Sequence, residues 1–335
     1  MNSSDNSNKN IKEEFLQNID RESKLSESHI LKNEYYGMAL ATLATFFQAF
    51  GAFYTKVIQR VYPTKFHTVQ FLFLRSFTIL ILSLFHNYYF QTHILRPKEI
   101  KLPFWFFIRT NVNFFGMAFF TMSIWYLRSS TAQIIATLAP IIVFILSYFI
   151  LREKFYMRYI YGLIICICGS SIIVLNEKKV NYSNNSIIHT FKETLTGVFF
   201  GIINIFLLAL VLVANKILAN NKIAIGIQMF YVAISTMTYS SIYSIIFGGV
   251  VLDPGLLFMC AIHGIFFYLG NVTNNKALQK APLSKLIIFN YLQIIFVFLL
   301  AYIFLNEKIF FTDIIGTIII LSYMIYNSLN PLPVK

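Results

Sequence analysis

The chain has 335 residues, of which 57% are hydrophobic and 12% are charged, and its mean hydropathy is +0.65. A soluble domain is about half apolar and a quarter charged, so this composition excludes an ordinary soluble protein and indicates one embedded in a bilayer. A net charge of +13 would suggest nucleic-acid binding in a soluble protein. Here Lys and Arg mostly flank apolar segments, where membrane topology and lipid headgroups account for them. We therefore expect the lipid bilayer as a partner and no nucleic acid.

Residues 1–34 form a polar tail rich in Asn, Ser, Lys and Glu, for which we predict disorder and a cytoplasmic location. The tail has neither the apolar core nor the small-residue cleavage site of a signal peptide. We therefore expect the first apolar segment to act as the insertion signal. The plasma membrane and the endomembranes of the secretory pathway are the expected locations.

Ten apolar segments follow in chain order, each close to the length of about twenty residues that crosses a hydrocarbon core of roughly 30 Å. They predict membrane-spanning helices at residues 35–58, 66–88, 102–125, 131–151, 159–176, 195–217, 224–250, 256–278, 282–305 and 309–329. The expected fold class is therefore an all-α polytopic membrane protein. Lys and Arg are more frequent in the loops on the N-terminal side, so we predict that both termini, including residues 330–335, are cytoplasmic.

The longest hydrophilic break, residues 177–194, separates the fifth and sixth predicted spans. It contains N-glycosylation sequons at Asn181 and Asn184, which the predicted topology places on the lumenal or external face. A third sequon, at Asn271, falls inside a predicted span, and we expect it to remain unmodified.

The two halves of the chain, residues 35–176 and 195–329, carry matching motifs at nearly constant offsets. The matching positions are Glu153 and Glu307, Gly162 and Gly316, Gly116 and Gly270, Gly37 and Gly197, and Lys56 and Lys216. Each half has five predicted spans, an odd number, so the second half must enter the membrane in the opposite sense from the first. Inverted repeats of this kind are the architecture of secondary transporters, which expose one central site alternately to each side. A duplicated scaffold without transport activity is the alternative.

Residues 131–144, TAQIIATLAPIIVF, are followed by LREK at 151–154 and by Gly162 and Gly169. This series resembles the closing part of an EamA repeat in the drug/metabolite transporter superfamily. The second half carries a looser version, with Ala281-Pro282, Glu307-Lys308 and Gly316. The resemblance extends over residues 35–329.

Two positions of the second half depart from the first: Ile294 stands where the first half has Pro140, and Tyr323 stands where it has Gly169. The resemblance implies two EamA repeats and transport of a small polar organic solute, by alternating access through a cavity between the halves. Members of the superfamily carry amino acids and other metabolites, nucleotide sugars or sugar phosphates. The resemblance therefore does not identify the solute. Members act as monomers or dimers, so a homodimer is possible for this chain.

The interiors of the apolar segments contain positively charged residues without acidic residues to balance them. Seven of the 14 acidic residues lie in the tail and the others near span ends, so no carboxylate is available at mid-membrane for proton or sodium coupling. Exchange or facilitated movement is therefore expected. Arg75 lies nine residues into the second span, about 14 Å along a helix, and the ends of Lys56, Lys276 and Lys285 add further positive charge. We predict that the solute is anionic, such as a nucleotide sugar, sugar phosphate or carboxylate, and that Arg75 binds it. Water, backbone carbonyls or helix C-termini are the structural alternative.

Uncharged polar side chains inside the spans are further candidates for hydrogen bonds to a solute. Together with Arg75, the predicted substrate-binding residues are Gln48, Asn113, Asn204, Asn274, Asn290 and Gln293. For each of these a hydrogen bond between helices is an equally good interpretation. The residues predicted to gate the cavity are Tyr54, Trp125 and Tyr126, near span ends. Arg109, about two turns into the third span, is interpreted as extending to the cytoplasmic headgroups.

The fifth span has a small-residue face, formed by Gly162, Cys166 and Gly169, for close helix packing within the protomer or across a dimer.

A membrane-embedded enzyme is the main rival to a transporter. The six histidines form no His-Glu-x-x-His pattern, and the three cysteines have no metal-ligand spacing. We therefore expect no catalytic residues, metal or cofactor. A channel would need a re-entrant filter or a repeated pore-lining ring, and neither is visible in the sequence.

Overall fold

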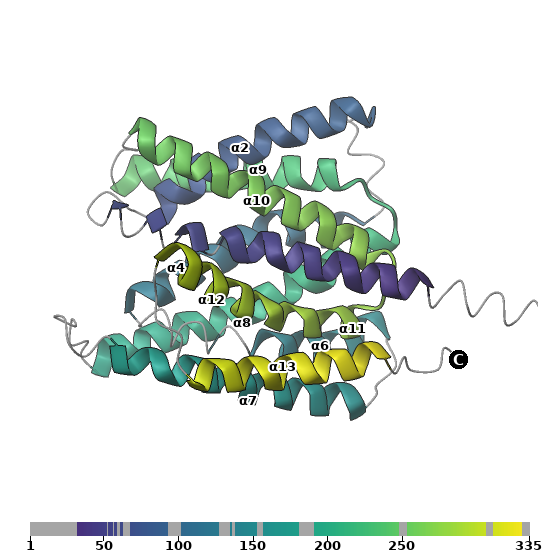
Figure 1. Cartoon of the computed structure of the whole chain (residues 1–335). Coiled ribbons are helices and arrows are strands. Elements are labelled where there is room, and N and C mark those ends of the chain that lie inside the picture. Colours follow the sequence, from purple (N-terminus) through teal and green to yellow (C-terminus); the bar gives the residue numbers. More distant parts are fainter. Residues whose placement is uncertain are drawn as a thin grey trace, which may run out of the picture.

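Apolar runs cross a bilayer only as helices or closed barrels, because lipid offers no hydrogen bonds to the backbone, and this chain forms helices. The computed structural model describes residues 32–51, 53–55, 57–58, 61–62, 68–92, 102–126, 135, 138–152, 157–180, 191–247, 253–305 and 311–329. Within these ranges no strand occurs. Figure 1 shows the helices side by side in one bundle.

The first half begins with an N-terminal helix that covers residues 32–58, apart from 52 and 56, which are not described. The elements that follow are α2 (Thr68–Tyr89), α3 (Pro103–Phe107), the π-helical turn η2 (Ile108–Val112), α4 (Asn113–Tyr126), α6 (Ala139–Leu151) and α7 (Met157–Val180). The second half consists of α8 (Phe191–Asn220), α9 (Ile225–Phe247), α10 (Pro254–Leu278), α11 (Leu283–Leu286), the 3-10 turn η4 (Ile287–Tyr291), α12 (Leu292–Leu305) and α13 (Phe311–Leu329).

Each predicted span contains a helix or a series of consecutive helices, so the all-helical fold class is confirmed. Six described helices are both long and apolar enough to cross a membrane: Lys32–Thr55, Gln70–Tyr89, Leu195–Asn220, Ile225–Ile246, Pro254–Leu278 and Leu283–Phe304. Helix α6 has 13 residues, about 20 Å, which is shorter than the hydrocarbon core. Ten crossings therefore stay a prediction.

Some sequence predictions lie outside the described residues. They are the tail up to residue 31, the sequons at Asn181 and Asn184, the Glu-Lys motifs at 153–154 and 307–308, and residues 330–335.

Equivalent helices of the two halves pack against each other in antiparallel pairs. Helix α7 packs on α13, and α2 packs on α9. Arg158, at the start of α7, donates from Nη2 to the carbonyl oxygen of Tyr326 near the end of α13, at 3.0 Å. Gly226, at the start of α9, lies beside His86 and Asn87 at the end of α2. Equivalent helices that run in opposite directions are what an inverted repeat requires.

Tyr323 occupies the place of the glycine that the second repeat lacks. A Cβ on Gly169 would lie 3.0 Å from the carbonyl oxygen of Gly316. In the equivalent contact, a Cβ on Gly162 would lie 2.0 Å from Cζ of Tyr323, whose hydroxyl donates to the carbonyl oxygen of Arg158 at 2.9 Å. The small-residue face of the fifth span therefore packs within the protomer, against α13.

This contact predicts opposite effects of the same substitution at two helical glycines. Gly162→Ala is expected to lower the free energy of unfolding by about 1–3 kcal/mol, because the buried Tyr323 ring must move and lose its hydrogen bond. At Gly116 the nearest atom to an added Cβ is 3.6 Å away, an ordinary contact. Gly116→Ala is therefore expected to be neutral or to stabilise by up to about 1 kcal/mol. Thermal unfolding of the purified variants compares them, and equal effects would contradict the packing described.

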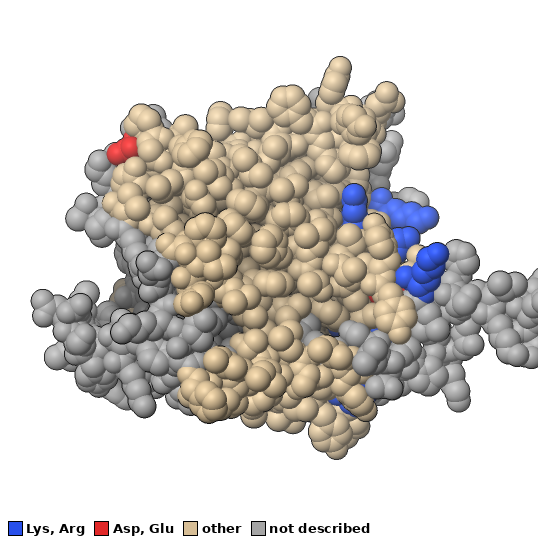
Figure 2. Space-filling view, viewed as in Figure 1, with Lys and Arg blue, Asp and Glu red and all other residues tan. Residues whose placement is uncertain are grey.

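The first residue of the N-terminal helix and the last residue of α13 lie on the same side of the bundle. In Figure 1 the N-terminal helix begins at the right, and α13 ends at the right. Exposed Lys and Arg side chains gather at this end in Figure 2. The exposed cations that the structure describes are Lys32, Arg152, Lys222, Lys276 and Lys280. By the positive-inside rule we predict that this end faces the cytoplasm.

We accordingly expect tags fused to the two termini to be accessible from the same, cytoplasmic, face. Antibody labelling before and after selective permeabilisation of the plasma membrane measures this accessibility. Labelling of the two tags from opposite faces would show that the number of crossings is odd, and the predicted topology would be wrong.

Candidate functional site

Arg109 lies on the π-helical turn η2, about two turns into the third predicted span. Its side chain is 1% exposed. One guanidinium nitrogen, Nη2, donates to Oδ1 of Asn271 on α10 at 2.8 Å, and Nη1 donates to Oδ1 of Asn113 at 3.4 Å. The interpretation that Arg109 extends to the headgroups is therefore wrong. Because a π-helical turn interrupts the helix here, it alters the facing of side chains, and such turns are frequent at functional sites.

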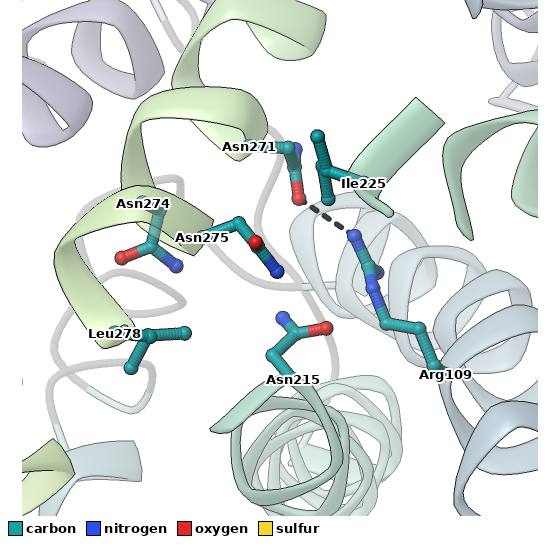
Figure 3. A pocket seen from close by; sticks show the side chains of 7 residues that line it. All are labelled: Arg109, Asn215, Ile225, Asn271, Asn274, Asn275 and Leu278. Atoms are coloured by element: carbon teal, nitrogen blue, oxygen red, sulfur yellow. Dashed lines mark hydrogen bonds between the residues drawn. The ribbon is translucent and has the colours of Figure 1, made fainter. Parts of the chain in front are cut away.

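A small polar space separates Arg109 from α8 and α10 (Figure 3). Its lining residues are Arg109, Asn215, Ile225, Asn271, Asn274, Asn275 and Leu278. The amides of Asn215, Asn271 and Asn275 face the same gap as the guanidinium, and none of the lining residues is acidic. The walls lie too close together for a water-sized sphere, so the space is closed in this conformation.

Four polar atoms in or beside this space have no hydrogen bond to the part of the chain that the structure describes. They are Nε of Arg109, Nδ2 of Asn113, Oδ1 of Asn215 and Nδ2 of Asn275. Buried polar groups in native proteins are almost always paired, and each unmet group costs about 1–3 kcal/mol. A guanidinium with an unpaired N–H of its own, two amide donors and one amide acceptor are suited to a polar solute that carries negative charge.

Among the predicted substrate-binding residues, Asn274 lines this space, and Asn113 accepts a hydrogen bond from Arg109. Gln48 and Asn204 instead lie at helix crossings. A Cβ on Gly270 would lie 3.1 Å from Cγ of Gln48, and Oδ1 of Asn204 lies 3.8 Å from the Cβ position of Gly116. These two crossings are equivalent in the repeat, so both side chains occupy packing positions.

The other predicted site residues lie elsewhere in the fold. Asn290 and Gln293 are half-buried on η4 and α12, and neither lines the space beside Arg109. Tyr54 is half-buried against a cluster that includes Phe71 and Leu256. The ring of Tyr126, the last residue of α4, lies 5.9 Å from that of Phe200 on α8. The side chain of Trp125 is outside the described residues. Gating by these aromatic residues stays a prediction.

Arg75, the main predicted anion-binding residue, is buried between α2 and α10 and is 2% exposed. Its guanidinium carbon lies 4.3 Å from the ring centroid of Phe267 and 5.8 Å from that of Phe71. A desolvated cation–π contact contributes about 2 kcal/mol, whereas a charge at the bilayer centre costs at least about 2.5–3.5 kcal/mol. The aromatic contacts therefore offset the burial of this cation only in part.

Of the lysines near the span ends, Lys285 and Lys216 have partners inside the protein, whereas Lys276 is exposed and Lys56 is outside the described residues. Nζ of Lys285 forms an ion pair with Glu34 at 2.7 Å, although the sequence places Glu34 in the tail. Nζ of Lys216 donates to the carbonyl oxygens of Leu278 at 2.5 Å and Ala281 at 2.7 Å, at the end of α10. Lys285 therefore adds no unbalanced charge, and the expectation of an anion rests on the two arginines.

Both halves of the chain match the model of one protein family, described as the EamA-like transporter family, over residues 35–175 and 195–328. The chain belongs to this family. As a family member it is an integral membrane transporter of small solutes, and it contains two EamA repeats, as the resemblance implied. The space beside Arg109 lies between these repeats, since η2 belongs to the first and α8 and α10 to the second.

A solved structure titled "Crystal structure of protein" has the same fold. It superposes with a TM-score of 0.70, covers 86% of this chain and 96% of its own, and shares 15% sequence identity. At this identity the likeness concerns the fold alone. No curated protein matches this chain.

The residues missed in the sequence are Asn215, Asn271 and Asn275, which line the space in this EamA protein. Two signals pointed to them. Asn215 precedes Lys216, one of the residues that the repeat aligns, and the other two belong to the polar run 271–275 within an apolar span. Asn271 is half-buried and hydrogen-bonded inside α10, which agrees with the expectation that its sequon stays unmodified.

Proposed function

We propose that this EamA-family protein is a secondary transporter that exchanges, or facilitates the movement of, a small anionic organic metabolite by alternating access. One observation carries the proposal: a fully buried guanidinium, Arg109, faces unmet amide groups between the two repeats, and no lining residue is acidic. A phosphate or carboxylate would supply the missing negative charge and accept hydrogen bonds in the bidentate geometry that a guanidinium favours.

The closed space explains why movement of the repeats is needed. Because the space has no room even for water, it admits a solute only after η2 separates from α8 or α10. Separation on one side at a time would expose Arg109 alternately to the two faces of the membrane. The halves would then close over the bound anion.

The same charge favours exchange over net movement. An empty carrier must return with Arg109 buried and uncompensated, whereas a loaded carrier crosses with the charge neutralised. No acidic residue lines the space to take up a proton in place of the solute. We therefore expect uptake of labelled solute to be faster when unlabelled solute is present on the opposite side.

Purified protein in liposomes tests the proposal. A thermal-shift screen of nucleotide sugars, sugar phosphates, carboxylates, amino acids and organic cations first identifies the stabilising solute. Counterflow with that solute is expected to saturate, and anionic analogues on the opposite side to accelerate it, while neutral analogues have no effect. Preference for a cation or a neutral solute, ohmic current without saturation, or conversion of the solute to a product would each overturn the proposal.

A further inference from the structure

Arg75 and His263 form a second buried polar cluster, separate from the space beside Arg109. The imidazole of His263 is 5% exposed and lies against Phe71, with ring centroids 4.7 Å apart. The ring of Phe267 is stacked over the same imidazole at 6.5 Å and lies beneath the Arg75 guanidinium. Neither Nε of Arg75 nor Nδ1 of His263 has a hydrogen-bond partner among the described residues.

The two arginines meet α10 on successive turns of one face. Arg75 lies over Phe267, and Arg109 is hydrogen-bonded to Asn271, four residues further along. Asn271 also donates from Nδ2 to the carbonyl oxygen of Phe267 at 2.9 Å, which links the two turns directly. Four residues correspond to about 6 Å along a helix, so the residues of α10 that contact the two buried cations lie about one turn apart along its axis.

No acid in the described part of the chain balances this pair of cations. The two acidic side chains described there lie at helix ends: Glu34 pairs with Lys285, and Asp253 accepts from the backbone N–H of Gly255 at the start of α10. Two like charges buried near each other disfavour one another, and a bound anion at either one relieves only half of the imbalance. A solute with negative charge at both of its ends would relieve it completely.

We infer that the solute carries two anionic groups, one bound by Arg109 and the other by Arg75, with Nδ1 of His263 beside the second group. The inference rests on the proposed function and specifies its substrate class: dicarboxylates or phosphorylated carboxylates short enough to extend over one turn of α10. Phe267, which contacts Arg75 in the closed conformation, would be the side chain that the second anionic group displaces.

Matched pairs of probes separate one anionic group from two. Succinate and succinamate differ by one carboxylate that is replaced by an amide, and phosphoglycolate and phosphoglycolamide differ in the same way. We expect the two-anion member of at least one pair to inhibit counterflow at a concentration at least about tenfold lower than its partner. Arg75→Gln is expected to remove this preference and leave inhibition by the one-anion member unchanged. Arg109→Gln is expected to weaken inhibition by both members.

Two further variants keep the test decisive. Arg75→Lys retains the charge but not the planar guanidinium, so we expect it to show a reduced preference for the two-anion member. This variant tests the inference even if Arg75→Gln does not fold. Ser76→Ala, at the next position of α2, should keep the full preference. Equal inhibition by both members of each pair in the wild type would overturn the inference, as would equal weakening of both by Arg75→Gln. Failure of every anion to inhibit the wild type would instead overturn the proposed function itself.

Discussion

Arg109→Gln is expected to raise the solute concentration needed for half-maximal transport by roughly 10- to 150-fold. A hydrogen bond to a charged group contributes about 1.5–3 kcal/mol, which corresponds to this range of affinity. The glutamine amide can still reach toward Asn271, so the helix contact is largely kept while the charge is lost. Counterflow in liposomes, with equal amounts of wild type and variant incorporated, measures the change.

Stability distinguishes a binding role of Arg109 from a structural one. Because no lining residue is acidic, replacing this buried cation by a neutral amide removes a desolvation cost without breaking an ion pair. The melting temperature of Arg109→Gln should therefore be equal to or higher than that of the wild type, as is common where a site sacrifices stability for function. Lys276→Gln, which neutralises an exposed cation on α10, is the matched control and should leave transport unchanged. Wild-type transport by Arg109→Gln, or joint loss of stability and transport, would assign Arg109 to the fold alone.

Hydropathy locates the helices because it is a local property of each segment. The predicted spans 256–278 and 195–217 correspond to α10, Pro254–Leu278, and α8, Phe191–Asn220, with ends displaced by a few residues. The repeat adds non-local information, since the glycines that it aligns lie at equivalent helix crossings. Neither hydropathy nor the repeat shows where a π-helical or 3-10 turn interrupts an α-helix within a span. The turns η2 and η4 occur within the predicted spans 102–125 and 282–305, with no Pro or Gly to mark them in the sequence.

The candidate site was predicted only in part for the same reason. Depth along a helix can be counted from the sequence, but whether a side chain such as Arg75 is buried between helices cannot. The direction in which a side chain points from a helix depends on the helical phase, and the π-helical turn changes that phase at Arg109. Partners depend on contacts between distant segments: Arg109 meets Asn271 across 162 residues, and Glu34 meets Lys285 across 251. No local pattern contains these pairs.

The ion pair between Glu34 and Lys285 connects the N-terminal helix to α11, and therefore joins the two repeats at the end predicted to be cytoplasmic. The two side chains are 14% and 4% exposed. Separation of the repeats at this end would have to break this charged contact.

Glu34→Gln is expected to lower the free energy of unfolding by about 2–3 kcal/mol, because it leaves Lys285 buried without its counterion. Breaking a fully buried pair costs about 3–5 kcal/mol, and the partial exposure of Glu34 reduces that value. The double variant Glu34→Gln/Lys285→Met should recover most of the loss, since no unpaired charge is left. Lys280→Gln, at an exposed position of the same end, should have little effect. The single variant Lys285→Met, measured with the wild type, Glu34→Gln and the double variant, completes a double-mutant cycle. Additive losses from the two single substitutions would show that the pair contributes no coupling energy.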